Sequence, residues 1–485
     1  MVSLPLRNES TLALASPAAP GWPHHIGILN DYVRIPYANG SSFASQRLYR
    51  EFRRRGHTVT VLGPRDPAAG PGDLPARSLM LPSLPLENHP GVYLPMPSRA
   101  SLKAARQQHF DLLLCQTGSA FTELAVWLRK TERVPFLCVN TIHLPSVYNV
   151  VLPDGWHDVP RVRALFERFV IPRLERQAAR IYNRSDGLIV LSRGLEMYWR
   201  ARGVTAPIFV IPRSVDVDMF AERGQSDPFD PRATPGGRLL VLCRHTREKG
   251  LARLLQIFAT EIAPHSPDAT LTLVGDGPDH DAFKALAKSL KIDDRTFFPG
   301  ECSAASAPAY YRHADLFVYT SLSETYGQVV SEAAFCGLPA VALADDMGVS
   351  HQIEHERTGI LITPTPEPAA DRAFGEAVCH LLANPLRRRA FAESARRSAF
   401  DRCGPAQAVE RHYAAFEAAR SHCQAQETRD EPLGTWRALS RWAGLHALAY
   451  LTGLLRAPAV VNRHKRQAPP WDEGIEGALG PLCAP

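Results

Sequence analysis

The sequence lacks several features that would assign it to a class at once. Its nine cysteines form no CxxC pair and no Cys/His zinc spacing, and several lie in apolar, strand-like runs. We therefore expect a reduced set of buried thiols in a cytoplasmic protein. No run of about eighteen apolar residues occurs, so no transmembrane helix is expected. Residues 1–22 have no basic start with a continuous apolar core behind it, and they are predicted to form a disordered leader.

Acidic residues are missing from one long stretch. Between Leu433 and Trp471 the chain carries six basic residues and no Asp or Glu, which accounts for the whole formal net charge of +6. The remainder is balanced, so the sequence argues against a nucleic-acid-binding core and for a local basic tail. With 485 residues, 45% hydrophobic and 21% charged, the composition is that of a globular enzyme of two or three domains.

Residues 321–339, SLSETYGQVVSEAAFCGLP, carry the most chemical information. The apolar residues 315–319 predict a buried parallel strand before this stretch, and the residues after Gly327 have helical character. Ligands bind at the carboxyl edges of open α/β sheets, and the unpaired N–H groups of a helix start suit a phosphate. Glu324 on the loop and Glu332 in the helix are expected to face one cleft, where carboxylates accept hydrogen bonds from sugar and ribose hydroxyls.

A pair of cations follows another predicted strand, at residues 239–243. Arg244 and Lys249 are expected to be exposed there, and two cations at the carboxyl end of a strand suit a diphosphate. The next predicted strand, 270–274, runs into a turn that begins with Gly275. Further strands are expected at residues 297–300, 339–343 and 359–362, which gives a complete α/β unit.

The first half of the chain has the same organisation. A strand at 25–30, a loop at 31–42, a helix at 43–55 and a strand at 58–62 form the start of a doubly wound sheet. More strands are predicted at residues 111–115, 135–139, 187–191 and 208–211, with a helix at 161–184 that is kinked at Pro172. The Pro/Gly-rich run 227–237 indicates a linker, and a helix is expected from Pro405 to about residue 419.

Two parts of the chain resemble the motifs of one enzyme group. They are Glu324 and Glu332 with the CGLP that follows, and the Asn39-Gly40 loop before an RGH turn. This group is the retaining, nucleotide-sugar-dependent glycosyltransferases of the GT-B fold, known as family 4 or group 1. The resemblance covers about residues 25–420. It implies an α/β protein with two Rossmann-like domains facing each other across a cleft, and a helical C-terminal tail. The expected parts are an acceptor domain (23–220), a linker (221–237), a nucleotide-sugar domain (238–404), a crossover helix (405–424) and a basic amphipathic tail (425–485).

The resemblance also implies roles for single residues. Arg244 and Lys249 would hold the diphosphate, Glu324 the sugar hydroxyls and Glu332 the ribose. His143, after the strand 135–139, would contact the donor sugar or the acceptor, and it joins Arg244, Lys249 and Glu324 in the expected catalytic set. The expected substrate-binding set is Asn39, Gly40, Ser41, Gly275, Glu301, Cys302, Tyr326, Gly327, Gln328 and Glu332.

Two places depart from the family pattern. The family often has Gly-Gly where this chain has Asn39-Gly40, a mild change because Asn also tolerates left-handed backbone. It usually has Asn-Gly where this chain has Arg213-Ser214, so the tight turn there must differ. His57 of the RGH turn is interpreted as a structural residue and not as a catalytic base.

The resemblance implies transfer of a sugar from a UDP-sugar or GDP-mannose to the hydroxyl of a sugar, lipid or lipid-linked acceptor, with retention at the anomeric carbon. Such enzymes generally work without a metal, so Asp216 and Asp218, which match a DxD motif, are not interpreted as ligands. No cofactor is expected beside the nucleotide sugar as co-substrate. Two alternatives stay open: a GT-B nucleotide-sugar epimerase, and a nucleotide-sugar-binding partner without turnover.

The basic tail has two interpretations. Residues 433–456 place leucines and two tryptophans mostly three apart, with arginines between them. This pattern fits a helix in a membrane interface, or an apolar stripe that packs on the protein itself. The many lipid-modifying members of the family favour an anionic membrane surface as partner, with a peripheral position on the cytoplasmic face. The arginine-rich segment 161–184 is interpreted as a solvated face, with a membrane-facing patch as the alternative.

Overall fold

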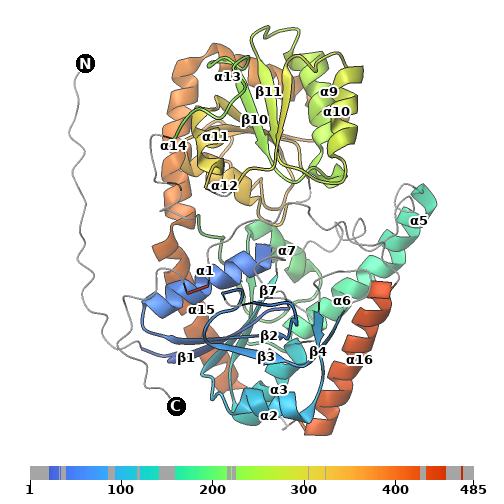
Figure 1. Cartoon of the computed structure of the whole chain (residues 1–485), viewed down its shortest axis with the longest axis vertical. Helices are drawn as coiled ribbons and strands as arrows, with labels where there is room; N and C mark the ends of the chain where they lie inside the picture. Colours follow the sequence, from blue (N-terminus) through green and yellow to red (C-terminus); the bar gives the residue numbers. More distant parts are fainter. Residues whose placement is uncertain are drawn as a thin grey trace, which may run out of the picture.

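The computed structural model describes residues 21–31, 33, 40–70, 72–85, 93–116, 121–140, 159–215, 220, 225–303, 305–322, 324–426, 433–454 and 471–472; the side chains of residues 40, 41 and 448–454 are excepted. These residues form two α/β domains, each built on a parallel sheet with helices on both faces (Figure 1). The predicted fold class, two Rossmann-like domains with a helical C-terminal region, is confirmed.

The first domain contains a seven-stranded sheet in the order β3-β2-β1-β6-β7-β8-β9. All neighbouring strands in it are parallel. The strands are β1 (His25–Leu29), β2 (Thr58–Pro64), β3 (Ser78–Leu81), β6 (Leu112–Cys115), β7 (Phe136–Asn140), β8 (Gly187–Val190) and β9 (Ile208–Val210). A separate antiparallel hairpin pairs β4 (Ser83–Pro85) with β5 (Tyr93–Pro95).

The second domain contains a six-stranded parallel sheet in the order β12-β11-β10-β13-β14-β15. Its strands are β10 (Arg238–Leu242), β11 (Thr270–Val274), β12 (Thr296–Gly300), β13 (Leu316–Tyr319), β14 (Ala340–Leu343) and β15 (Gly359–Ile362). Every residue of β10, β11 and β13 is buried. Parallel strands covered on both faces need continuous apolar runs, which is why the sequence signalled them so clearly.

Helices cover both sheets (Figure 1). Those of the first domain are α1 (Gly40–Arg54), α2 (Arg99–Arg106), α3 (Thr122–Glu132), α5 (Pro160–Leu165), the π-helical turn η3 (Phe166–Val170), α6 (Ile171–Tyr182) and α7 (Arg193–Ala201). Those of the second are η4 (Arg247–Lys249), α9 (Leu251–Ile257), η5 (Phe258–Ile262), α10 (His280–Ser289), α11 (Ala307–His313), α12 (Gln328–Phe335), α13 (Glu367–Ala383) and α14 (Pro385–Cys403).

Two consecutive helices connect the domains. α14 ends at Cys403, and α15 (Pro405–Ala425) begins with a proline at its first position, where no N–H donor is needed. Phe391 and Cys403 of α14 belong to the apolar core of the second domain, whereas Val409 and Phe416 of α15 are buried in the core of the first. The chain therefore returns to the first domain through α15, beneath its sheet (Figure 1).

The structure corrects several details of the sequence predictions. The strand β3 and the β4–β5 hairpin were not predicted, and the helix expected at 43–55 begins earlier, at Gly40. The segment 161–184 is helical as expected, but its irregularity is the π-helical turn η3, directly before Pro172. His57 is buried, and its ring nitrogens bond the carbonyl of Pro23 and the hydroxyl of Tyr413, which agrees with a structural role.

The C-terminal helix α16 (Thr435–Leu454) packs on the first domain. Ala438 and Trp442 are buried in one apolar cluster with Phe121 and Leu124, at the start of α3, whereas Trp436 stays 70% exposed. Farther along, Trp471 is buried beside Tyr49. For Leu433 and Trp442 of the predicted stripe, which are both buried in this cluster, packing on the protein is therefore the interpretation that agrees with the structure. Among the described helices, none is long and apolar enough to cross a membrane.

One buried carboxylate links three elements of the first domain. Asp186, just before β8, accepts hydrogen bonds from Arg129 Nε on α3 at 2.9–3.0 Å and from the N–H of Phe136 at 3.1 Å. His422 of α15 lies 3.1 Å from the same carboxylate. Arg129 is only 5% exposed, so this ion pair is shielded from water on both sides.

We expect Asp186→Ala to lower the free energy of unfolding by about 3–5 kcal/mol, because the substitution removes one partner of the buried ion pair with Arg129. Urea denaturation followed by circular dichroism measures the loss. Asp230→Ala is the matched control, because Asp230 pairs with Arg232 at the surface. Equal midpoints for the two variants would contradict the role given to Asp186.

Candidate active site

The carboxyl edge of the second sheet brings three loops together, after the neighbouring strands β10, β11 and β13. A Cβ atom on Gly275 would lie 1.9 Å from the carbonyl oxygen of Cys243, and one on Gly250 would lie 2.6 Å from that of Thr320. Both glycines also have positive φ angles, 138° and 70°. The loops therefore pack backbone against backbone, which fixes the positions of the side chains that follow the strands.

Glu324 is the centre of the hydrogen bonds at this edge. Its Oε1 accepts from Lys249 Nζ at 2.5 Å, Tyr319 Oη at 2.7 Å and Ser321 Oγ at 2.9 Å. The Glu324 and Lys249 side chains are 12% and 19% exposed. Lys249, expected to be an exposed cation, is instead one half of a largely buried ion pair. All three donors use Oε1, and no residue in the described part of the chain donates to Oε2, which can therefore accept a hydrogen bond from a ligand.

Burial and charge act in opposite directions on this pair. Burial alone would raise the pKa of Glu324, but the Lys249 ammonium and the three hydrogen bonds lower it below the ordinary value. Burial would likewise lower the pKa of Lys249, but the Glu324 carboxylate raises it. Both groups are therefore charged near neutral pH.

The loop that carries Glu324 is held by the segment after β14. Gly327 has a φ angle of 76° and precedes the first residue of α12. The Gln352 side-chain amide donates to the carbonyls of Tyr326 and Gly327, and its oxygen accepts from Ser331 Oγ on α12. A Cβ atom on Gly348 would lie 2.6 Å from the backbone nitrogen of Tyr326. The helix start is thus fixed by side-chain amide bonds and close backbone contact.

Glu332 lies in a second group of residues, at the facing ends of α11 and α12. Tyr311 Oη donates to Glu332 Oε2 at 3.0 Å. Burial raises the pKa of Tyr311 well above its ordinary value, and the Glu332 carboxylate that accepts its hydrogen bond adds to this effect. Cys302, which follows β12, is a neighbour of the same tyrosine. Glu332 and Cys302 of the expected substrate-binding set are therefore both neighbours of Tyr311.

The remaining predicted residues are distributed unevenly. Arg244 is exposed directly after β10 and makes no ion pair with any described residue, and Glu301 is exposed after β12. Gly40 and Ser41 are the first residues of α1, but their side chains, like all of Asn39 and His143, lie outside the described residues, as do Asp216 and Asp218. Within the described part of the chain, no three His, Cys, Asp or Glu side chains gather as metal ligands would.

The structure adds two arginines that sequence reasoning missed. Burial and the charge of Arg47 lower the pKa of Arg213 to about 10, and the buried Nε of Arg213 has no hydrogen-bond partner among the described residues. Arg47 Nη1 donates to the carbonyl of Ser214 at 2.7 Å, and the Gln328 side chain of the other domain lies 3.5 Å from the same oxygen. The sequence feature that could have identified Arg213 is the departure from the family's Asn-Gly at Arg213-Ser214. This departure places a cation where the two domains meet.

We expect Lys249→Met to destabilise the protein at pH 7 by about 3 kcal/mol, the low end for one partner removed from a buried pair. The pKa of Glu324 is lowered in the folded state, so the pair stabilises the fold above the ordinary carboxyl pKa of about 4.3. That stabilisation is lost as the pH falls through the lowered value. The melting-temperature gap to wild type should therefore narrow toward pH 4. The control is Lys288→Met on α10, and a gap that is the same at pH 4 and pH 7 would exclude the ion pair as its cause.

Comparison with known proteins extends this geometry. The HepE protein of Anabaena, solved in complex with UDP and glucose, has a TM-score of 0.60 at 17% identity; the match covers 81% of this chain and all of that one. Sucrose-phosphate synthase of Thermosynechococcus elongatus has a TM-score of 0.59 at 20% identity, covering 81% of this chain and 98% of that one. These likenesses show the two-domain fold.

Sequence relatives support a family assignment. The alpha-monoglucosyldiacylglycerol synthase of Streptococcus pneumoniae is 24% identical over 70% of this chain and 77% of its own. The GDP-mannose-dependent alpha-mannosyltransferase of Mycobacterium tuberculosis is 25% identical over 76% of this chain and 91% of its own. Residues 38–219 match the family model Glycosyltransferase Family 4, and residues 230–398 match Glycosyl transferases group 1. The chain therefore belongs to the group 1, or family 4, glycosyltransferases, which use nucleotide sugars.

Proposed function

We propose that the protein moves a sugar from a nucleoside-diphosphate sugar to an acceptor hydroxyl, with retention at the anomeric carbon. The observation that carries the proposal is the Lys249–Glu324 pair at the carboxyl edge of β10 and β13. It lies beside the N-terminus of α12, and the N–H groups and positive dipole end of a helix start favour an anion. A cation, a carboxylate with one free oxygen and a helix start are what a diphosphate joined to a sugar requires.

The proposed chemistry follows from the charges. When the bond between the anomeric carbon and the diphosphate breaks, its electrons remain on the diphosphate. Lys249, Arg244 and the N–H groups at the start of α12 oppose that growing charge, which stabilises the transition state. The acceptor proton passes to an oxygen of the leaving phosphate, so the step assigns no work to a carboxylate nucleophile, a metal or a cofactor. Glu324 Oε2 accepts from a sugar hydroxyl, and Glu332 binds the ribose.

The donor is proposed to be a UDP-sugar or GDP-mannose. One relative is named for GDP-mannose, and HepE was solved with UDP and glucose. Thermal-shift measurements with UDP, GDP and ADP separate these bases, because a ligand that binds the folded state raises the melting temperature by an amount set by its affinity.

We expect Glu324→Gln to lower kcat by about 10²-fold while the Kd of the free nucleoside diphosphate changes little, because the carboxylate is assigned to the sugar. Product analysis gives the first quantity and calorimetry the second, with the exposed Glu367→Gln as control. Loss of nucleotide binding would move Glu324 to a structural role. Conversion of the donor by the wild type without any acceptor would favour an epimerase over a transferase.

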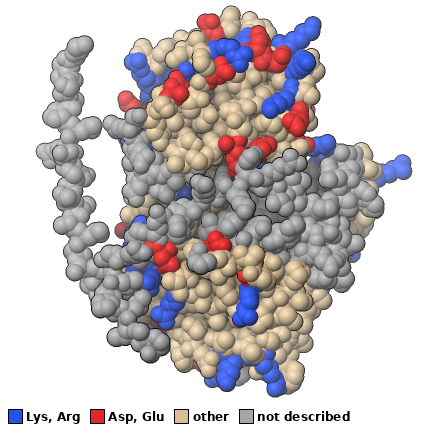
Figure 2. Space-filling model, in the orientation of Figure 1, with Lys and Arg blue, Asp and Glu red and all other residues tan. Residues whose placement is uncertain are grey.

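The acceptor is proposed to be a lipid or a lipid-linked molecule, reached from the cytoplasmic face of an anionic membrane. α5 and η3 project from the first domain, and Figure 2 shows basic side chains at this end of the molecule (Figures 1 and 2). Leu165 and Phe169 there are 61% and 46% exposed, next to the exposed Arg161 and Arg168. Exposed apolar side chains between arginines suit a membrane interface. The name of the diacylglycerol-modifying relative adds support.

We expect the double variant Leu165→Ser/Phe169→Ser to pellet at least about ten-fold less with anionic vesicles at low salt, because it removes most of the apolar surface that would enter the interface. Leu386→Ser is the control, since Leu386 is 76% exposed on α14 of the other domain. Sedimentation with phosphatidylglycerol vesicles measures the effect. Equal pelleting of both variants would remove α5 and η3 from the proposed membrane contact.

A further inference from the structure

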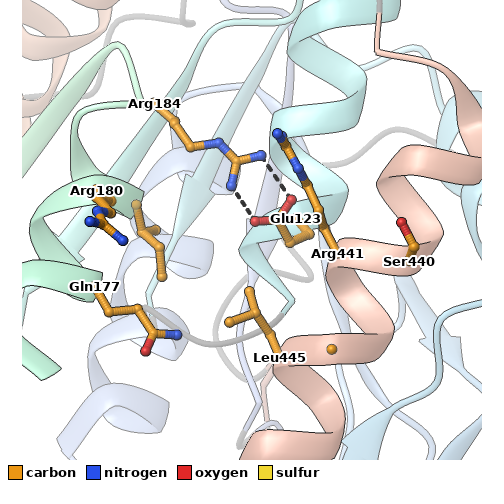
Figure 3. Close-up of a pocket in the computed structure, with 9 residues that line it drawn as sticks. Glu123, Gln177, Arg180, Arg184, Ser440, Arg441 and Leu445 are labelled. Carbon is orange, nitrogen blue, oxygen red and sulfur yellow. Dashed lines mark hydrogen bonds and ion pairs between the residues drawn. The ribbon is translucent and has the colours of Figure 1, made fainter. Parts of the chain in front are cut away.

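A cavity of about 360 Å³ lies between α3, α6 and α16 of the first domain, away from the second sheet (Figure 3). Glu123 of α3 forms its back, and Gln177, Arg180 and Ile181 of α6 form one wall together with Arg184. The opposite wall is α16, with Ser440, Arg441, Gly444 and Leu445. No step of the proposed transfer uses these residues.

The cavity holds more positive than negative charge. Arg184 binds the buried Glu123 through two parallel contacts, of which Nη2 to Oε2 measures 2.8 Å. Each of these two charges therefore has its partner. Arg180 and Arg441 are exposed and form no ion pair with any described residue. Three guanidinium groups thus line one cavity with a single carboxylate.

The packing of α16 fixes this arrangement. Trp442 is 1% exposed in the apolar cluster with Phe121 of the first domain, and the next residue toward the N-terminus is Arg441. Burial of Trp442 therefore fixes α16 on the first domain, with Arg441 on the wall opposite α6. The positive charges of Arg180 on α6 and Arg441 on α16 repel each other, which opposes packing of α16 on the domain. An anion bound between them removes this repulsion.

The remaining lining is apolar. Ile181 and Leu445 stand on opposite walls, and Gly444 leaves room between them because it has no side chain. Figure 3 shows Leu445 at the other end of the cavity from the guanidinium group of Arg184. The cavity therefore has a cationic end and an apolar end, which fits a ligand with an anionic head and a carbon body. Its volume of about 360 Å³ lies at the small end of the range for ligand pockets.

We propose that this cavity binds a phosphate ester, with its phosphate on Arg180, Arg184 and Arg441 and its carbon body against Ile181 and Leu445. Arginine presents a fork of donors that matches phosphate oxygens, and Gln177 and Ser440 add neutral donors at the rim. The phosphate belongs to a soluble ester or to a lipid headgroup, which share this chemistry. The inference does not depend on the proposed transfer, because the cavity and the donor site lie in different domains.

The test uses calorimetry on the full chain with glycerol phosphate and with a short-chain phosphatidate below its micelle concentration. Saturating nucleoside diphosphate, or the Lys249→Met variant, keeps the probes out of the donor site. We expect Arg180→Gln and Arg441→Gln each to weaken binding at least about ten-fold, because each removes a hydrogen bond to a charged group. Binding of glycerol phosphate assigns the site to a soluble ester, and binding of the phosphatidate alone assigns it to a lipid headgroup.

Arg176→Gln on α6 and Arg437→Gln on α16 are matched controls, because both arginines are exposed on the same helices but do not line the cavity. These variants should bind like the wild type. The proposal is overturned if neither probe binds, if the control variants lose as much affinity as the cavity variants, or if Lys249→Met alone abolishes binding. The melting temperature of each variant without ligand shows whether the fold has survived the substitution.

Discussion

The candidate site depends on one ion pair between two loops that are far apart in the sequence. Lys249 follows β10 and Glu324 follows β13, and they meet because these strands are neighbours in the sheet. The meeting also requires Gly250, where a Cβ atom would collide with the carbonyl oxygen of Thr320. Since Lys249, Tyr319 and Ser321 all donate to Oε1, the carboxylate is held in one orientation, and its second oxygen has no donor among the residues that the structure describes. The pair therefore both braces the loops and prepares the acceptor for a ligand hydroxyl.

The sequence predicted the sheets well because their signal is local. Strands buried on both faces are continuous apolar runs, and the predicted strands agree with the observed ones to within one or two residues. β3 was missed because it is a half-exposed edge strand with no such run. Lys249 and Glu324 could each be identified from the local sequence pattern, but the ion pair between them could not be predicted. That pairing is set by strand order, which is a property of the whole sheet.

The tail shows where a local pattern is insufficient. An apolar stripe with arginines fits a membrane or another helix equally, and only the partner surface decides between them. That surface was visible in the sequence of α3, which has apolar residues around most of its circumference and is buried nearly throughout. A helix of this kind must be covered by something, and Trp442 of α16 covers part of it. Trp436, six residues earlier, has the guanidinium of Arg99 4.1 Å from its ring centroid but remains 70% exposed.

The cations of the two domains are in different electrostatic states. Lys249 in the second domain is neutralised by Glu324, whereas Arg213 in the first has no carboxylate partner among the described residues and has its pKa lowered by burial and by Arg47. Arg213 borders the loop that carries Tyr326, so its charge acts across the domain boundary. In the proposed reaction, a diphosphate at the start of α12 would therefore be attracted by Arg213 of the first domain as well as by Arg244 of the second. Binding of the donor would then favour the arrangement in which the two domains are in contact, because that contact brings the unpaired charge to the phosphate.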